Sequence, residues 1–159
     1  MDPINIIIGL NIIATFGANV GAAKKGIKDK VGVFKDKPKT YLQTLPLVLS
    51  TIALVVLIVS LFQIGTLEYK TENQTLRVIG LAIYIVFSWV QIWSTKTLGD
   101  NFSQDIAIKK EHHLVTDGPF KFIRHTQYLS QFLMDLGGAA ATLSFILAPL
   151  ALIQIPFLF

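Results

Sequence analysis

The chain has 159 residues, of which 52% are hydrophobic and 15% are charged, and its mean hydropathy is +0.57. Soluble domains carry about 25% charged residues, so the composition argues against a water-soluble fold and indicates lipid as the main solvent. The absence of cysteine excludes disulfides and thiolate metal sites, and the distribution of the net charge of +4 suggests a membrane face rather than nucleic acid.

The first apolar run covers residues 4–23, and no basic start of a cleavable signal peptide precedes it. A spanning helix needs about 20 mostly apolar residues, so we expect a first transmembrane helix here. Gly17 and Gly21 have the spacing that lets two helices approach closely, and we expect them to pack against a partner helix. The alternative is a peripheral helix in which these glycines have no role.

Two more spans are expected in the middle of the chain. Residues 41–67 contain the most apolar stretch of the sequence, and residues 77–95 form the third span. The third span ends with Trp89 and Trp93, and because indole rings favour the membrane interface, we expect this end to lie at the bilayer edge.

The last apolar stretch has 32 residues. One helix of that length would measure about 48 Å, against about 30 Å of hydrocarbon. Pro149 and Pro156 also disfavour a straight helix. We expect a fourth span over residues 128–147, a break near Pro149 and a partial return helix over residues 149–159; the alternative is one tilted, kinked helix. Because so short a return does not cross a bilayer, we expect the natural chain to continue beyond Phe159.

Basic residues are concentrated in two loops, residues 24–40 and 96–127, which hold 12 of the 14 lysines and arginines. The positive-inside rule places both loops in the cytosol and the N-terminus outside. The expected fold is therefore all-α: a polytopic integral membrane bundle with four spans and a partial fifth helix. Membrane lipids are expected partners and nucleic acid is not.

A polar stripe leads into the fourth span. Arg124, Tyr128, Gln131 and Asp135 are separated by four, three and four residues and so share one helix face. Ionisable groups at membrane depth are costly unless they meet a partner or a water-filled cavity, so we expect Arg124, Gln131 and Asp135 to bind substrate. The alternatives are a structural bond between Asp135 and an asparagine of the first span, and an Arg124 that only reaches lipid phosphates.

The loop before this span has two further features. His112 and His113 are adjacent and lack the spacing of zinc ligands, so no metal site is expected. Gly118 and Pro119 predict a tight turn whose backbone can approach a ligand.

Loop and span together carry a longer pattern. It consists of Leu98-Gly99, Phe102-Ser103, His112 before Leu114-Val115, Gly118, Phe120 and Arg124-His125-Thr126-Gln127-Tyr128. This pattern resembles the signature of the isoprenylcysteine carboxyl methyltransferase family, membrane enzymes that use S-adenosylmethionine. Thr126 stands where the family has proline, and threonine can start a helix as its N-cap. The family also has a cytosolic segment with paired glutamates after the helical hairpin, which we expect beyond Phe159.

The resemblance implies methyl transfer from S-adenosylmethionine to a lipid-like or prenylated acceptor at the cytosolic face of the membrane. The cofactor-binding residues that it implies are His112, Leu114, Val115, Gly118, Phe120, Arg124, His125 and Tyr128. Arg124 would face a carboxylate of the cofactor or the acceptor. Two alternatives stay open: a catalytically inert membrane scaffold that keeps the fold, and an NADPH-dependent sterol or steroid reductase of similar layout.

Overall fold

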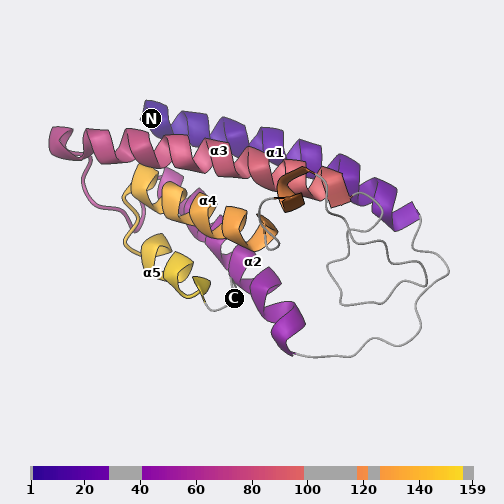
Figure 1. Ribbon diagram of the computed structural model, residues 1–159. Helices are drawn as coiled ribbons and strands as arrows, with labels where there is room; N and C mark the ends of the chain where they lie inside the picture. Colours follow the sequence, from indigo (N-terminus) through magenta and orange to yellow (C-terminus); the bar gives the residue numbers. More distant parts are fainter. Residues whose placement is uncertain (1, 29–40, 99–117, 122–125, 156–159) are drawn as a thin grey trace.

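The computed structural model describes residues 2–28, 41–98, 118–121 and 126–155 (Figure 1). Within these ranges the chain forms helices and no strand, which confirms the all-α class, and an isolated bridge joins Thr66 to Ser144. The helices are α1 (Pro3–Lys28), α2 (Tyr41–Leu61), α3 (Gln74–Leu98), α4 (Thr126–Thr142) and α5 (Leu147–Leu152), with short 3₁₀ helices η1 (Thr71–Asn73) and η3 (Gly118–Lys121).

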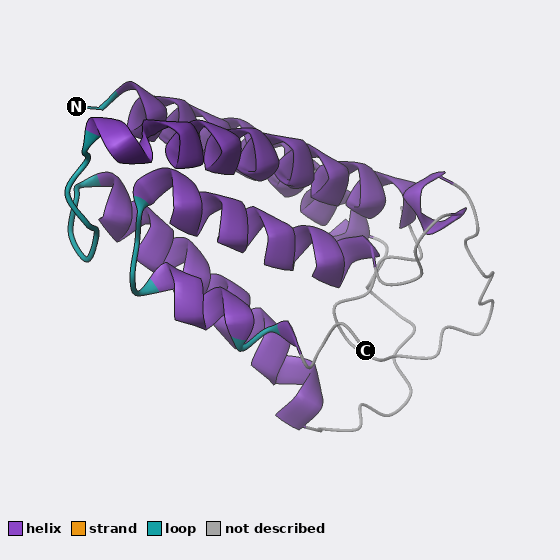
Figure 2. Ribbon diagram, turned by 60° about the vertical axis from the view of Figure 1, so that its left-hand side comes forward, coloured by secondary structure: helices purple, strands orange, loops and turns teal. Residues whose placement is uncertain are grey.

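The helices form a bundle in which successive members run in opposite directions. α1 lies beside α3, α4 packs against α3, and α5 folds back along α4, while α2 packs against both α4 and α5 (Figures 1 and 2). The C-terminal ends of α1 and α3 and the N-terminal ends of α2 and α4 lie toward the same end of the bundle (Figure 1). We call this the basic end, because these helix ends adjoin both lysine-rich loops of the sequence. The α2–α3 and α4–α5 connections lie at the opposite end.

The bundle places apolar side chains outside and polar ones inside. Ile13 and Phe16 on α1 are 71% and 66% exposed, whereas Arg77 and Asp135 are each 1% exposed. Trp89 and Trp93 are also exposed on α3, as an interfacial position requires. Buried charged residues and exposed aliphatic ones reverse the pattern of soluble proteins. The surface therefore fits hydrocarbon, and the polar groups meet one another in the interior.

One helical stretch of the described residues is long and apolar enough to cross a bilayer, Thr71–Thr97. Pro3–Ala18 and Val48–Leu61 are shorter apolar helices. A four-span topology therefore remains a prediction.

Two helices end earlier than the sequence predicts. α2 was expected to reach residue 67 but ends at Leu61, since the backbone has positive φ at Gln63 (63°) and Gly65 (70°). This turn then pairs with the α4–α5 connection, where Leu67 N–H donates to Leu143 O at 3.0 Å. The apolar composition continues past Leu61, but the helix does not.

The break after the fourth predicted span also comes earlier. α4 ends at Thr142, because Leu143 adopts a left-handed φ of 52°, whereas the break was expected near Pro149. Pro149 instead lies in the first turn of α5, where its missing N–H costs little. A short helix follows over Leu147–Leu152; it begins two residues before the predicted return helix of residues 149–159, whose last four residues lie outside the described ranges.

Close helix packing occurs at glycines other than the predicted pair. A Cβ at Gly80 of α3 would lie 2.6 Å from the backbone nitrogen of Ala141, and a Cβ at Gly137 of α4 would lie 2.7 Å from that of Tyr84. The α3 and α4 backbones can approach this closely only because both positions lack a side chain. A Cβ at Gly17 would meet nothing within 4 Å. Gly17 therefore makes no close contact within the described part of the bundle, and a partner helix for it stays a prediction.

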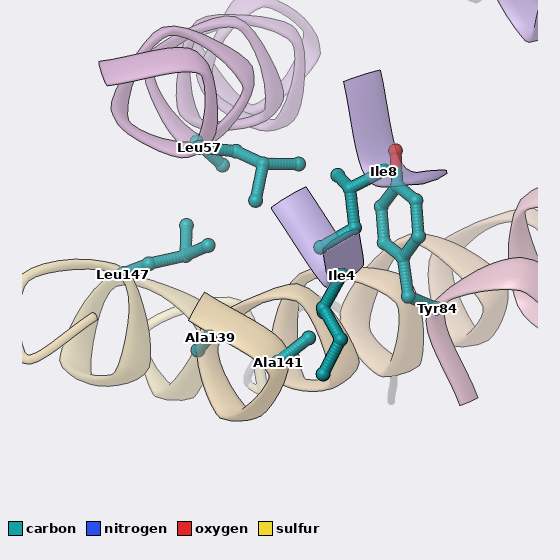
Figure 3. Close-up of a cluster of buried hydrophobic side chains, with 8 residues drawn as sticks. Ile4, Ile8, Leu57, Tyr84, Ala139, Ala141 and Leu147 are labelled. Carbon is teal, nitrogen blue, oxygen red and sulfur yellow. The ribbon is translucent and has the colours of Figure 1, made fainter. Parts of the chain in front are cut away.

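The apolar core joins all five α-helices. Ile4 and Ile8 of α1, Leu57 of α2, Tyr84 of α3, Ala139 and Ala141 of α4, and Leu147 of α5 are its labelled members (Figure 3). Large side chains from α1, α2 and α5 fill the space over the small residues of α4. The short helix α5 is thereby fixed to the bundle, although six residues alone would not be stable.

Arg77 holds the opposite end of the bundle together. Its guanidinium donates to the two Asp2 carboxylate oxygens at 2.6 and 3.0 Å and to Ala141 O at 3.0 Å. It also lies 3.6 Å from the centroid of the Tyr69 ring. A cation near the last carbonyls of α4 stabilises that helix end. Arg77 is thus a buried link between the N-terminus, α3 and α4.

Candidate functional site

A chain of polar side chains lies between α3, α4 and α5. Gln91 Nε2 donates to Gln131 Oε1 at 2.7 Å, and Gln131 Nε2 donates to Asp135 Oδ2 at 2.9 Å. Gln154 Nε2 donates to the same Asp135 oxygen at 2.7 Å. One turn nearer the basic end, Gln127 Nε2 donates to Thr95 Oγ1 at 3.2 Å. We call Gln91, Thr95, Gln127, Gln131, Asp135 and Gln154 the polar seam.

Asp135 is the charged member of the polar seam. It is 1% exposed, and the amide groups of Gln131 and Gln154 satisfy one of its oxygens. The alternative that Asp135 pairs with an asparagine of the first span is wrong for Asn5 and Asn11. Asn5 donates to Leu61 O, and Asn11 donates to Ser88 Oγ. Both groups that donate to the Asp135 carboxylate are uncharged side-chain amides. The bond from Gln154 connects the segment after α5 to α4, so Asp135 has a structural role.

The predicted polar stripe is thus brought together in part. Gln131 and Asp135 share one face of α4 and are hydrogen-bonded at the i, i+4 spacing. Tyr128 lies on α4 with 45% of its surface exposed and is not a member of the polar seam. Arg124 and His125 lie outside the described residues.

The tight turn expected at Gly118 and Pro119 forms as the 3₁₀ helix η3. Gly118 has φ of 61°, and a Cβ there would lie 2.9 Å from Thr97 Oγ1. The backbone of Gly118 therefore approaches α3 closely. Pro119 is buried, and its carbonyl accepts the Thr126 hydroxyl at 3.4 Å, which ties the turn to the first residue of α4.

The remaining predicted cofactor residues are divided between described and undescribed parts of the chain. Phe120 lies in η3 and is partly buried. His112, Leu114 and Val115 lie outside the described residues, as does the histidine pair on which the metal prediction rests. The structure therefore positions the two ends of the predicted motif: Leu98, where α3 ends, and Thr126, where α4 begins.

Sequence reasoning missed four of the six members of the polar seam: Gln91, Thr95, Gln127 and Gln154. Gln91 and Thr95 are one turn apart on α3, and Gln127, Gln131 and Asp135 follow each other at four-residue spacing on α4. The matching periods of the two helices are a signal that could have found their pairing. Gln154 has no such signal, since its contact depends on the turn between α4 and α5.

An apolar groove of about 470 Å³ lies between α3, α4 and the α4–α5 turn, toward the end of the bundle opposite to the basic end. Its floor includes Gly80 and Gly137. The single polar residue of its lining is Ser144, whose hydroxyl donates to Gly65 O at 3.2 Å. The groove offers room for an apolar ligand but no group for chemistry.

Comparison with known proteins agrees with the motif. The sequence model of the isoprenylcysteine carboxyl methyltransferase (ICMT) family matches residues 78–159, just over half of the chain. The match covers almost all of α3 together with η3, α4 and α5, which are the elements that carry the polar seam. A search of curated proteins finds no match.

Proposed function

Since the chain belongs to the isoprenylcysteine carboxyl methyltransferase family, a family of methyltransferases, we propose that it methylates a lipophilic acceptor at a membrane surface. S-adenosylmethionine is the proposed methyl donor, and a prenylated cysteine or a similar lipid-like carboxylate is the proposed acceptor.

The observation that carries the proposal is the course of the polar seam. It begins near η3 at the basic end and runs between α3 and α4 to Asp135, inside a bundle with an apolar outer surface. A reaction between a water-soluble donor and a lipid-soluble acceptor needs a place where polar groups meet hydrocarbon. The basic end of the bundle is such a place.

The residues described there fit a polar ligand. The first turn of α4 meets Thr95 through Gln127, and Gly118 packs against Thr97. The buried hydroxyl of Ser94 has no hydrogen-bond partner in the described part of the chain. Amide and hydroxyl groups are thus the polar groups that the described residues place at this end of the bundle. We propose that they combine there with the residues that the family motif implies: His112, Leu114, Val115, Gly118, Phe120, His125 and Tyr128.

When bound, S-adenosylmethionine supplies a methyl group on a sulfonium, and its transfer to a carboxylate oxygen forms a methyl ester and leaves a neutral thioether. An ionised carboxylate is already a nucleophile, so the protein needs to provide alignment and exclusion of water rather than a general base. In this proposal Arg124 donates two parallel hydrogen bonds to a ligand carboxylate. Gln131 and Asp135 support the acceptor side.

We also propose a multi-pass orientation with the basic end in the cytosol. Twelve of the 14 lysines and arginines fall in the two loops that adjoin this end. The positive-inside rule then puts the N-terminus and the Arg77 link on the outer side.

The experiment that tests the proposal is a calorimetric titration of the purified protein in detergent. We expect S-adenosylmethionine to bind with a stoichiometry of one and NADPH to give no heat of binding. Binding of NADPH alone would favour a reductase, and binding of neither ligand would favour an inert scaffold.

A further inference from the structure

Ser94 is a buried hydroxyl without a partner. Its side chain is 0% exposed, and its Oγ atom finds no hydrogen-bond partner within the part of the chain that the structure describes. Leaving a buried hydroxyl unpaired costs about 1–3 kcal/mol, so such a group in a folded protein calls for an explanation.

Other serine and threonine hydroxyls in the helices of this bundle form hydrogen bonds with the backbone of their own helix. A helical serine or threonine can donate back to the carbonyl three or four residues earlier. Six of the described residues do so, at 2.8–3.1 Å: Thr15, Ser60, Ser88, Thr95, Thr97 and Thr142. Ser94 does not, although Thr95 beside it does. Its hydroxyl is therefore free to bond something other than its own helix.

Ser94 lies on α3 between the polar seam and the 3₁₀ helix η3. Gln91, Ser94 and Thr97 follow each other at three-residue spacing, which places them along one row of α3. Gln91 holds Gln131 of the polar seam, and Thr97 contacts Gly118 of η3. Ser94 thus lies between the seam and the turn. Its neighbour Thr95 also accepts a hydrogen bond from Gln127, in the first turn of α4.

We propose that the Ser94 hydroxyl contacts the bound ligand and donates a hydrogen bond to a carboxylate oxygen. This inference rests on the proposed function, in which both the methyl donor and the acceptor carry a carboxylate. The positive dipole end of α4 and the exposed Lys121 lie at the same end of the bundle and favour an anionic group. The members of the polar seam already form hydrogen bonds with one another. Ser94 lies between the seam and η3, and its hydroxyl has no hydrogen-bond partner among the described residues.

The test uses purified full-length chain in detergent and the variant Ser94→Ala. Ser60→Ala is the matched control, because Ser60 is equally buried but its hydroxyl is bonded to Val56 O and Ser144 Oγ at the opposite end. Thermal unfolding without ligand, the Kd for S-adenosylmethionine and the KM for an S-prenylated N-acetylcysteine are measured for each.

We expect Ser94→Ala to unfold at the same or a higher temperature than wild type, since it removes an unpaired polar group. One ligand constant should rise about tenfold, the equivalent of one lost hydrogen bond to a charged group. A higher Kd assigns the contact to the methyl donor, and a higher KM alone assigns it to the acceptor. Ser60→Ala should unfold at a lower temperature with both constants unchanged.

Three results would overturn the assignment. If Ser94→Ala lowers the melting temperature as much as Ser60→Ala does, the Ser94 hydroxyl makes a structural hydrogen bond and not a ligand contact. Ser94→Ala with unchanged Kd and KM has lost no ligand contact. Wild-type protein that binds no S-adenosylmethionine contradicts the proposed function itself, and the Ser94 contact is rejected with it.

Discussion

Gln154, two residues after the end of α5, donates a hydrogen bond of 2.7 Å to Asp135 in the middle of α4. The two residues are 19 positions apart in sequence, and both side chains are buried. A carboxylate surrounded by apolar helices is stable only when such donors face it. The family match extends over both partners, so this link belongs to the part of the chain that carries the proposed chemistry.

A double-mutant cycle measures the strength of this link. Asp135→Ala should destabilise the protein by about 2 kcal/mol or more, because it leaves two buried amide donors unpaired. Gln154→Ala should cost less. The two changes should be coupled by about 0.6–1.7 kcal/mol, the range of hydrogen bonds inside membrane proteins. Unfolding in denaturant-containing micelles gives the four free energies. Purely additive effects would contradict the bond.

Close packing of α3 on α4 predicts opposite effects of two glycine substitutions. Gly80→Ala places a methyl group 2.6 Å from the backbone of α4, which cannot yield locally, so we expect a loss of about 1–3 kcal/mol. Gly17→Ala is the control in α1, where a methyl group meets open space and alanine favours the helix by up to about 1 kcal/mol. Thermal unfolding followed by circular dichroism compares the two. Equal losses would show that Gly80 does not lie at a tight contact.

The link between Arg77 and Asp2 predicts an acid-sensitive contribution to stability. The hydrogen bond from Arg77 lowers the pKa of the Asp2 carboxyl below its ordinary value. A carboxyl with a lowered folded-state pKa stabilises the fold fully above about pH 4 and loses that contribution as the pH falls through the folded value. Asp2→Asn should therefore lower stability at neutral pH and flatten its acid dependence.

The control for this prediction is Glu68→Gln. Glu68 is exposed and lies 3.8 Å from exposed Lys70, a pair that contributes little to stability. Melting temperatures from pH 7 down to pH 2.5 should follow wild type for Glu68→Gln. If Asp2→Asn also follows wild type over the whole range, the Arg77 link does not contribute as the geometry indicates.

Orientation in the membrane can be read with single cysteines, because the natural chain has none. Glu72→Cys and Lys121→Cys place exposed thiols at opposite ends of the bundle. An impermeant maleimide added to intact cells should label residue 72, and residue 121 only after permeabilisation. The unsubstituted chain is the blank. Labelling of position 121 alone from outside would reverse the proposed topology.

Helix periodicity explains which parts of this structure could be predicted. The helix α4 and the shared face of Gln131 and Asp135 follow from spacing within one helix. These features depend on local sequence. Each was therefore accessible without coordinates.

Features that depend on how two segments meet could not be predicted in the same way. α2 ends at Leu61 because its turn pairs with the α4–α5 connection, although the apolar composition continues. The close glycine contact uses one glycine from each of two helices, whereas the rule applied to Gly17 and Gly21 considers a pair on one helix. The burial of Arg77 depends on Asp2, which is 75 residues away in sequence, so no local pattern indicates it.

Substitution of Arg124, which lies outside the described residues, tests the proposed ligand-binding site directly. Arg124→Ala should keep the melting temperature of wild type and weaken S-adenosylmethionine or acceptor binding about tenfold, since it removes a charged hydrogen-bond donor. Calorimetry and thermal unfolding give the two quantities. Unchanged affinity and turnover would remove Arg124 from the site.

The central claim is tested most directly by methyl transfer in vesicles that contain the purified protein. The assay combines S-adenosylmethionine labelled on its methyl group with an S-prenylated N-acetylcysteine and measures base-labile methyl ester. We expect ester that increases with time and protein and that disappears when the acceptor lacks its carboxyl group. Wild-type protein that binds both molecules but forms no ester would contradict the account.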